Sequence, residues 1–197
     1  MVTSEEIRAV KAIGDEVFET ALAEEKFCKQ FYERDRHERP QNRDRGVLDL
    51  PEIAFVDQLV HRLVGASVGH VVRVIDWEVE SQVSRASGRT DLVLRLDGFP
   101  RKFAFEFKIG GSDRAYLKDL DKLGQLDSKT YVRVFCALLD VVRGHPEGDG
   151  RLSAFEQRQD LIAVGHRGGG FPQFDARFRR MRAKEISCVV GIWVLRD

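Results

Sequence analysis

The chain has 197 residues, 43% of them hydrophobic, which is enough for one domain with a substantial core. Its 32 basic and 32 acidic side chains give a formal net charge of zero, so overall charge supplies no attraction for nucleic acid and argues against a protein that coats it. The longest apolar run, residues 131–142, is too short to span a bilayer, and the charged first residues do not form a signal peptide. The 3 cysteines contain no CxxC pair and fit buried, reduced thiols, so we expect a soluble cytoplasmic protein.

Residues 1–46 are predicted to form a helix followed by an Arg-rich linker. Ser4 with two glutamates behind it is typical of a helix start, and apolar residues recur at helical spacing as far as about Tyr32. The next stretch, residues 34–45, has no hydrophobic periodicity, contains Pro40 and mixes arginines with acids. This composition favours a solvated linker over an arm that contacts DNA.

Residues 47–142 are predicted to form the core. Pro51 followed by Glu52 suits the first turn of a helix that ends near Gly65. The elements expected after it are strands near residues 70–83, 91–96 and 103–109, a helix near 113–126 and a strand at 131–142. Short connections make the first three strands an antiparallel meander, and the helical crossover sets the fourth strand parallel to a neighbour. The expected core is a mixed α/β (α+β) sheet in the order αβββαβ, with helices on both faces.

Residues 143–197 are predicted to extend this core within a single domain that spans residues 1–197. A loop rich in Gly, Pro and Asp comes first. The elements expected after the loop are a short helix near residues 152–159, a strand at 161–164, a basic helix over Asp175–Lys184 and a final strand at 188–195.

Three charged residues on neighbouring predicted strands form the candidate active site. Asp91 opens one strand, and Glu106 and Lys108 lie two residues apart on one face of the next strand. If the two strands are antiparallel, Asp91 and Glu106 fall at the same edge of the sheet. Their carboxylates could then share a divalent ion, because Mg²⁺ takes one or two carboxylates and completes its shell with waters and phosphate oxygens. The Lys108 ammonium could stabilise charge on a phosphate, so the set predicts a metal-dependent hydrolase site.

At Asp91 and Glu106–Lys108 the sequence resembles the PD-(D/E)xK, or restriction-endonuclease-like, nuclease superfamily. The resemblance covers roughly residues 51–142, and Thr90 replaces the nominal proline of the motif. It implies a restriction-endonuclease-like αβββαβ core, hydrolysis of phosphodiester bonds, Mg²⁺ or Mn²⁺ as cofactor and DNA as the usual substrate. It also implies that Glu52, on the helix before the first strand, completes the metal site with the two strand carboxylates.

Five arginines are candidate contacts to nucleic acid. Four of them, together with Lys184, form the densest basic cluster of the chain, in which two aromatic residues are interleaved: Arg177, Arg179, Arg180 and Arg182, with Phe174 and Phe178. On a helix the aromatic rings would face the core and the arginines would project outward, where they suit phosphate oxygens. A solvated helix face is the alternative. The fifth, Arg89 beside Asp91, either contacts the scissile phosphate or pairs with a carboxylate.

Four other polar residues near the candidate site have two interpretations each. Glu78 and Glu80 share one face of the first core strand and supply either a further metal ligand or an exposed strand face. Lys118 and Gln125 lie on one side of the crossover helix, where solvated surface is favoured over a place in the site.

The sequence thus predicts a Mg²⁺- or Mn²⁺-dependent endonuclease in which Asp91 and Glu106 hold the ion and Lys108 assists water activation and the phosphate. One site per chain would favour a homodimer for cutting both strands of DNA. Two alternatives stay open. One is a catalytically inactive protein of the same fold that serves as a binding or assembly subunit. The other is an unrelated α/β domain whose acid–lysine pair is a surface ion pair.

Overall fold

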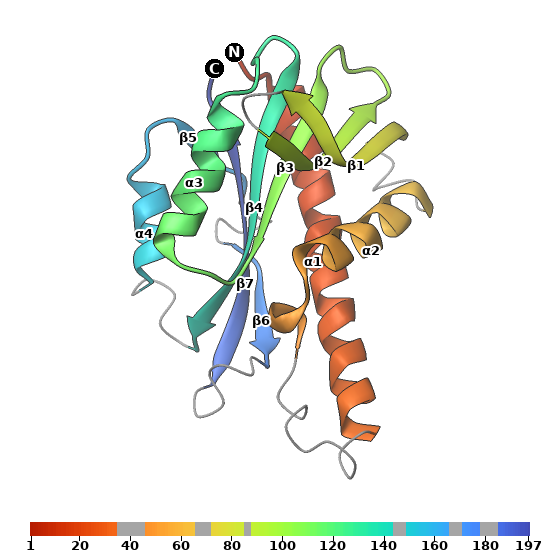
Figure 1. The fold of residues 1–197 in the computed structure, drawn as a ribbon, viewed down its shortest axis with the longest axis vertical. Helices are drawn as coiled ribbons and strands as arrows, with labels where there is room; N and C mark the ends of the chain where they lie inside the picture. The colour runs from red at the N-terminus through yellow and green to blue at the C-terminus, as the bar shows by residue number, and fades with distance from the viewer. Residues whose placement is uncertain (35–45, 66–71, 85–87, 144–148, 166–170, 178–184) are drawn as a thin grey trace.

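The computed structural model describes residues 1–34, 46–65, 72–84, 88–143, 149–165, 171–177 and 185–197. Within these stretches the protein has a mixed α/β structure, in which four α-helices pack around one seven-stranded sheet (Figure 1). None of the helices in these stretches is long and apolar enough to cross a membrane.

The elements of the central part follow the order that the sequence predicts. The helices are α1 (Ser4–Arg34), the short 3-10 helix η2 (Val47–Asp49), α2 (Glu52–Gly65), α3 (Asp113–Gly124) and α4 (Gly150–Glu156). The strands are β1 (Val74–Ser84), β2 (Gly88–Leu96), β3 (Lys102–Ile109), β4 (Tyr131–Val142), β5 (Leu161–Ala163), β6 (Gln173–Ala176) and β7 (Ile186–Leu195). The succession α2-β1-β2-β3-α3-β4 confirms the predicted helix, three strands, helix and strand.

Backbone pairing confirms the predicted meander and crossover. The strands are hydrogen-bonded in the order β1-β2-β3-β4-β7-β5, and β6 also pairs with β7. β1 pairs antiparallel with β2 and β2 with β3, through a turn in which Gly98 has a φ of 79° and the Phe99 amide donates to the Leu96 carbonyl at 3.3 Å. Glycine adopts such a φ at little steric cost. Helix α3 then carries the chain across the sheet, so that β4 runs parallel to β3.

Helices cover both faces of the sheet, and each face has its own apolar cluster. Helices α1 and α2 pack on one face, against residues that include Leu94 and Phe103. Helices α3 and α4 pack on the other face, against residues that include Val93 and Ala104 (Figure 1). Because successive strand residues point to opposite faces, β2 and β3 contribute to both clusters. Strands β4 and β7 lie between covered faces, which explains why each is an almost continuous apolar run.

Helix α1 begins at the predicted residue and is capped by the residue before it. The Thr3 amide donates to a Glu6 carboxylate oxygen at 2.8 Å, and the Glu6 amide donates to the Thr3 hydroxyl oxygen at 3.2 Å. This reciprocal capping box satisfies amides that the helix itself leaves open. Glu6 is buried and also accepts a hydrogen bond from Arg101 Nε at 2.8 Å, so the cap ties α1 to the start of β3.

The outermost strand of the meander, β1, is irregular. Its register against β2 shifts between Val74 and Asp76 and again between Ser81 and Ser84. Glu80 has a φ of 50°, which is uncommon for a residue with a side chain. Such irregularities increase the local twist of a strand.

The predicted basic helix over Asp175–Lys184 is wrong in its first part. Residues Gln173–Ala176 form β6, which pairs antiparallel with β7. A two-residue alternation explains the strand. Phe174 packs against Phe18 of α1 with ring centroids 5.8 Å apart, whereas its two neighbours are exposed. The rest of the predicted helix, residues 178–184, lies outside the described residues.

The position of α3 on the sheet can be tested with two of its leucines. Leu120 is 0% exposed and Leu117 is 41% exposed. We expect Leu120→Ala to lower the free energy of unfolding by about 2–5 kcal/mol, because it leaves a cavity. Leu117→Ala, the matched control, should change it by less than about 0.5 kcal/mol. Urea denaturation measures both values, and equal losses would contradict this placement of α3.

Candidate functional site

The candidate site lies where β2 and β3 separate. The paired residues of these two strands end at Leu92 opposite Phe105, while β2 continues alongside β1 and β3 continues alongside β4. Asp91 and Glu106 are the next residues beyond that last pair. At this fork the Asp91 Oδ2 atom accepts a hydrogen bond of 2.7 Å from the Phe107 amide, so a side chain satisfies a strand amide.

Asp91 and Glu106 are directed to the same face of the sheet. Residues directly opposite each other in an antiparallel pair share a face, and the register of β2 and β3, continued by one residue, sets Asp91 opposite Glu106. Two residues further into the sheet, Val93 and Ala104 belong to the cluster under α3. The fork therefore opens on the α3 side of the sheet.

Glu106 is almost completely buried, and only one of its two carboxylate oxygens has a hydrogen-bond partner. It is 3% exposed, its Oε1 lies 2.5 Å from Lys122 Nζ, and its Oε2 is a buried atom with no hydrogen-bond partner. Burial and the nearby charge of Asp91 raise the pKa of Glu106 to about 8, although the Lys122 ammonium acts in the opposite direction. A buried carboxylate oxygen without a donor is costly, so this atom fits an approaching cation or proton.

Lys108 is held by two carboxylates at the end of β3. Its Nζ lies 3.1 Å from Glu52 Oε1 and 3.3 Å from Asp119 Oδ2. Burial alone lowers the pKa of Lys108, but the hydrogen bonds and charges of these two carboxylates outweigh burial and hold the pKa above its usual value. The ammonium is therefore charged at neutral pH.

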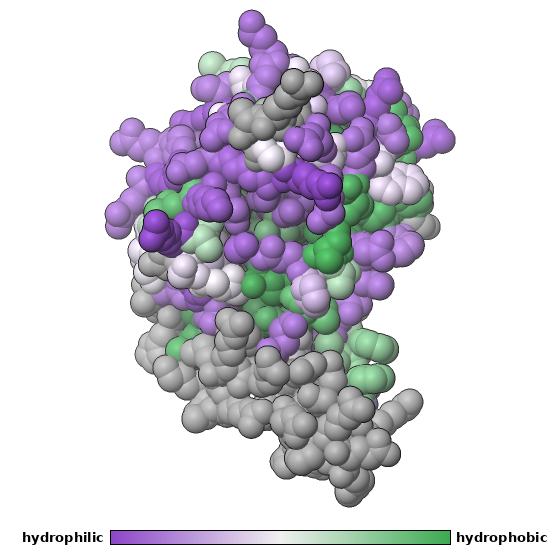
Figure 2. All heavy atoms as spheres, viewed as in Figure 1, coloured by the Kyte–Doolittle hydropathy of each residue, from purple (hydrophilic) through white to green (hydrophobic). Residues whose placement is uncertain are grey.

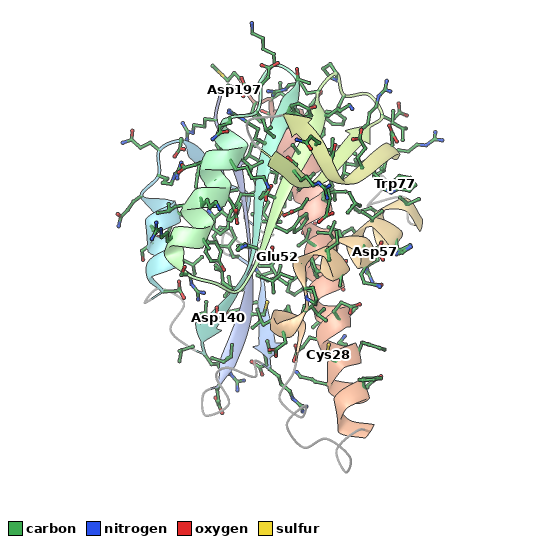
Figure 3. The ribbon with its side chains drawn as sticks, viewed as in Figure 1. Cys28, Glu52, Asp57, Trp77, Asp140 and Asp197 are labelled. Carbon is green, nitrogen blue, oxygen red and sulfur yellow. The ribbon has the colours of Figure 1, made fainter. Side chains whose placement is uncertain are left out.

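Glu52 reaches the site from the first turn of α2. Its Oε1 also accepts a hydrogen bond from the Ile109 amide at 3.2 Å, so it anchors the end of β3 as well as Lys108. In Figure 3 Glu52 lies near the centre of the view, where α2 begins. Figure 2 shows mainly hydrophilic residues in the upper part of this view and hydrophobic residues across its middle.

Six charged side chains thus form one cluster that draws on α2, β2, β3 and α3: Glu52, Asp91, Glu106, Asp119, Lys108 and Lys122. Burial raises the pKa of Asp91. The Phe107 amide and Lys122 oppose that rise, and the charges of Glu52 and Asp119 add to it. The cluster has four carboxyl groups and two ammonium groups, so when every carboxyl group is ionised it has an excess of two negative charges, which one divalent cation would balance.

Asp119 and Lys122 were missed by sequence reasoning, which considered Lys118 and Gln125 on the same helix. Lys118 and Gln125 are both exposed, which confirms the solvated surface favoured for them. The helical period carried a usable signal, because Asp119 flanks the buried stripe of α3 and Lys122 follows it by three residues on the same side. The sequence alone did not say which side of α3 faces the fork.

Arg89 pairs with a carboxylate, which is one of the two roles considered for it. Its guanidinium lies 3.2 Å from Glu80, and the side chain is 66% exposed. Glu78 lies 3.6 Å from Lys102 and accepts a hydrogen bond from the Ser81 hydroxyl. Both glutamates are exposed, which fits the exposed strand face considered for them.

Of the predicted arginine cluster, the structure describes only Arg177. Its amide donates to Glu25 Oε1 at 2.9 Å, which ties the end of β6 to α1. The other members, Arg179, Arg180 and Arg182, lie outside the described residues, so their predicted contacts with nucleic acid stay predictions.

Comparisons of the chain with protein-family models, curated proteins and solved structures found no match. Within the described ranges, no group of three or more His, Cys, Asp and Glu side chains is arranged to hold a metal ion. Mg²⁺ requires fewer, because one or two carboxylates with waters and phosphate oxygens complete its shell. Asp91 and the unpartnered Oε2 of Glu106 are the atoms of this cluster that fit such an ion.

The raised pKa of Glu106 makes stability depend on pH. Between pH 4.5 and about 8 the folded protein keeps a proton on Glu106 that the unfolded chain releases, so this group's contribution to stability falls as pH rises through that window. In a chelating buffer we expect the melting temperature of Glu106→Gln, relative to the unchanged protein, to rise from pH 5 to pH 8. The exposed acid Asp97, changed to Asn, is the control. A constant difference across the window would contradict the burial of an ionisable Glu106.

Proposed function

We propose that the protein is a metal-dependent phosphodiester hydrolase that acts on nucleic acid. The observation that carries the proposal is the buried Glu106 carboxylate, whose Oε2 has no hydrogen-bond partner and which faces the same side of the sheet as Asp91 and Lys108. Asp91 and Glu106 would hold Mg²⁺ or Mn²⁺. Such an ion, when bound, polarises a phosphodiester and lowers the pKa of its bound water.

The residues of the chain have separate tasks in this proposal. Asp91 is fixed by the Phe107 amide, so one of its oxygens is positioned and the other is free to face the ion. Lys108 keeps its proton and can donate it in hydrogen bonds to phosphate oxygens, where it stabilises developing negative charge. Glu52 orients that ammonium from α2.

The arrangement of the core supports a restriction-endonuclease-like fold. The order α2-β1-β2-β3-α3-β4, the antiparallel meander and the parallel crossover are the features that the resemblance implies. The acid of β2 and the acid and lysine of β3 lie at one edge of this sheet. DNA as substrate rests on the resemblance alone. A homodimer would supply a second site for cutting both strands.

A second function, that of an inactive binding or assembly subunit, is favoured by one observation. The ammonium groups of the cluster are already paired within the protein, Lys108 with Glu52 and Asp119 and Lys122 with Glu106. A closed network of this kind can be structural. The two functions differ in their requirement for a divalent ion and in the effect of isosteric changes at the carboxylates.

Cleavage of supercoiled plasmid DNA tests the hydrolase directly. We expect nicking in Mg²⁺ or Mn²⁺ and none in chelator, with Asp91→Asn at least about 10²-fold slower because a ligand charge is lost. Asn keeps an acceptor for the Phe107 amide, so the fold should persist. Asp97→Asn, an exposed change in the turn between β2 and β3, is the matched control. Cleavage in chelator, or equal rates for the two variants, would end the proposal.

The role of the Lys108 charge can be tested with a substitution that nearly keeps the length of the side chain. Lys108→Met should slow cleavage by about 10²–10³-fold, because a charged donor to the phosphate is removed. Its far-ultraviolet circular dichroism should match that of the unchanged protein. The control is Lys118→Met, an exposed position on α3. If activity and folding are lost together, Lys108 is structural.

A further inference from the structure

We propose that Lys122 is an internal counter-ion of Glu106 when no divalent ion is bound, and that its ammonium group opposes the binding of such an ion at Asp91 and Glu106 until it moves away. This inference rests on the proposed function, because it concerns the same carboxylates. It assigns a positioning role to a residue of α3 that the motif of β2 and β3 does not contain.

The contact between the two side chains is close and shielded from water. Lys122 Nζ lies 2.5 Å from Glu106 Oε1, and the Glu106 side chain is 4% exposed. The neighbouring position on β4 is Phe135, which is fully buried. In such surroundings a carboxylate needs a positive partner, and the ammonium is the partner that the structure provides. It satisfies one oxygen and leaves Oε2 without a partner.

The two lysines of the cluster differ in how firmly they are held. Lys108 is bound by two carboxylates, from α2 and α3, and lies within β3. Among the described residues, Lys122 pairs with one carboxylate. Lys122 lies in the last turn of α3, and its side chain is 23% exposed, so its ammonium can reach solvent by rotation of its own stem. Lys122 is therefore the cation that a divalent ion can displace without disturbing the sheet.

The net charge of the cluster favours replacement of the Lys122 ammonium by a divalent ion. With both ammonium groups in place and all four carboxyl groups ionised, the cluster has an excess of two negative charges. A divalent ion at Asp91 and Glu106 would neutralise that excess, but it would also lie close to the Lys122 ammonium and be repelled by it. Removing the ammonium while keeping the length of the side chain should therefore strengthen binding of the ion.

The experiment measures binding of Mn²⁺ alone, without nucleic acid, by the electron paramagnetic resonance signal of free Mn²⁺. We expect Lys122→Met to bind Mn²⁺ more tightly than the unchanged protein, on the order of tenfold. Lys118→Met, one turn earlier on α3 and exposed, should bind like the unchanged protein. The double variant Lys122→Met with Glu106→Gln should lose the gain, which assigns it to Glu106.

Thermal melting provides a second readout that does not depend on activity. In chelator, Lys122→Met should melt below the unchanged protein, because Glu106 loses its counter-ion, and Mn²⁺ should raise its melting temperature more than it raises that of the unchanged protein. Should Lys122→Met fail to fold, Lys122→Gln takes its place in both measurements.

If Lys122→Met binds Mn²⁺ only as tightly as the unchanged protein, or more weakly, the counter-ion role is overturned. The hydrolase proposal is unaffected by that result, since cleavage is measured separately. If Lys122→Met binds Mn²⁺ and the unchanged protein does not, the counter-ion role of Lys122 is supported. If no variant binds Mn²⁺, the counter-ion role is overturned together with the metal site. Plasmid cleavage in Mg²⁺ then decides whether any hydrolase activity exists.

Discussion

The hydrogen bond from the Phe107 amide to Asp91 Oδ2 is the interaction on which the candidate site depends. Phe107 is 1% exposed, so its amide has no water to bond to at the point where β2 and β3 separate. The Asp91 carboxylate satisfies that amide and is thereby fixed beside Glu106. One contact therefore serves both purposes: it ends the pairing of the two strands without an orphaned donor, and it presents a carboxylate at the fork.

The charged side chains at the fork are unusual because they lie among apolar, buried parts of the sheet and its helices. The parallel crossover through α3 covers one face of β3 and β4, so Glu106 lies under a helix, and burial raises its pKa. The same helix supplies Asp119 and Lys122, and α2 supplies Glu52 from the other side of the sheet. Residues that are far apart in the sequence thus restrain one another electrostatically. A cluster of this kind is expensive to bury, which favours a function that uses it over a role in stability alone.

Periodicity predicted most of the core, because its elements are amphipathic or continuously apolar. The strand at 131–142 and the start of α1 at Ser4 were confirmed. Strand alternation and antiparallel register account for the common face of Asp91, Glu106 and Lys108. Glu52 reaches Lys108 from α2, but within the described residues Glu52, Asp91 and Glu106 are not arranged as the three-carboxylate metal group that the resemblance implies. The failures have physical reasons. The strand β6 is too short for its alternation to outweigh the helical spacing of Phe174 and Phe178. Lys122 was missed, because the helical period shows that it flanks the buried stripe of α3 but not which flank faces the fork, which is set by packing against β3 and β4.

The irregular course of β1 bears on how the protein behaves at high concentration. β1 ends the order of the described strands, and such an edge exposes backbone groups that can recruit a strand from another molecule. Two register shifts and the left-handed backbone at Glu80 prevent a long flat edge, while Asp76 and Glu78 would bring like charges together if two copies met there. The sheet is thereby protected at this side against growth into aggregates, even though Trp77 is 45% exposed beside it.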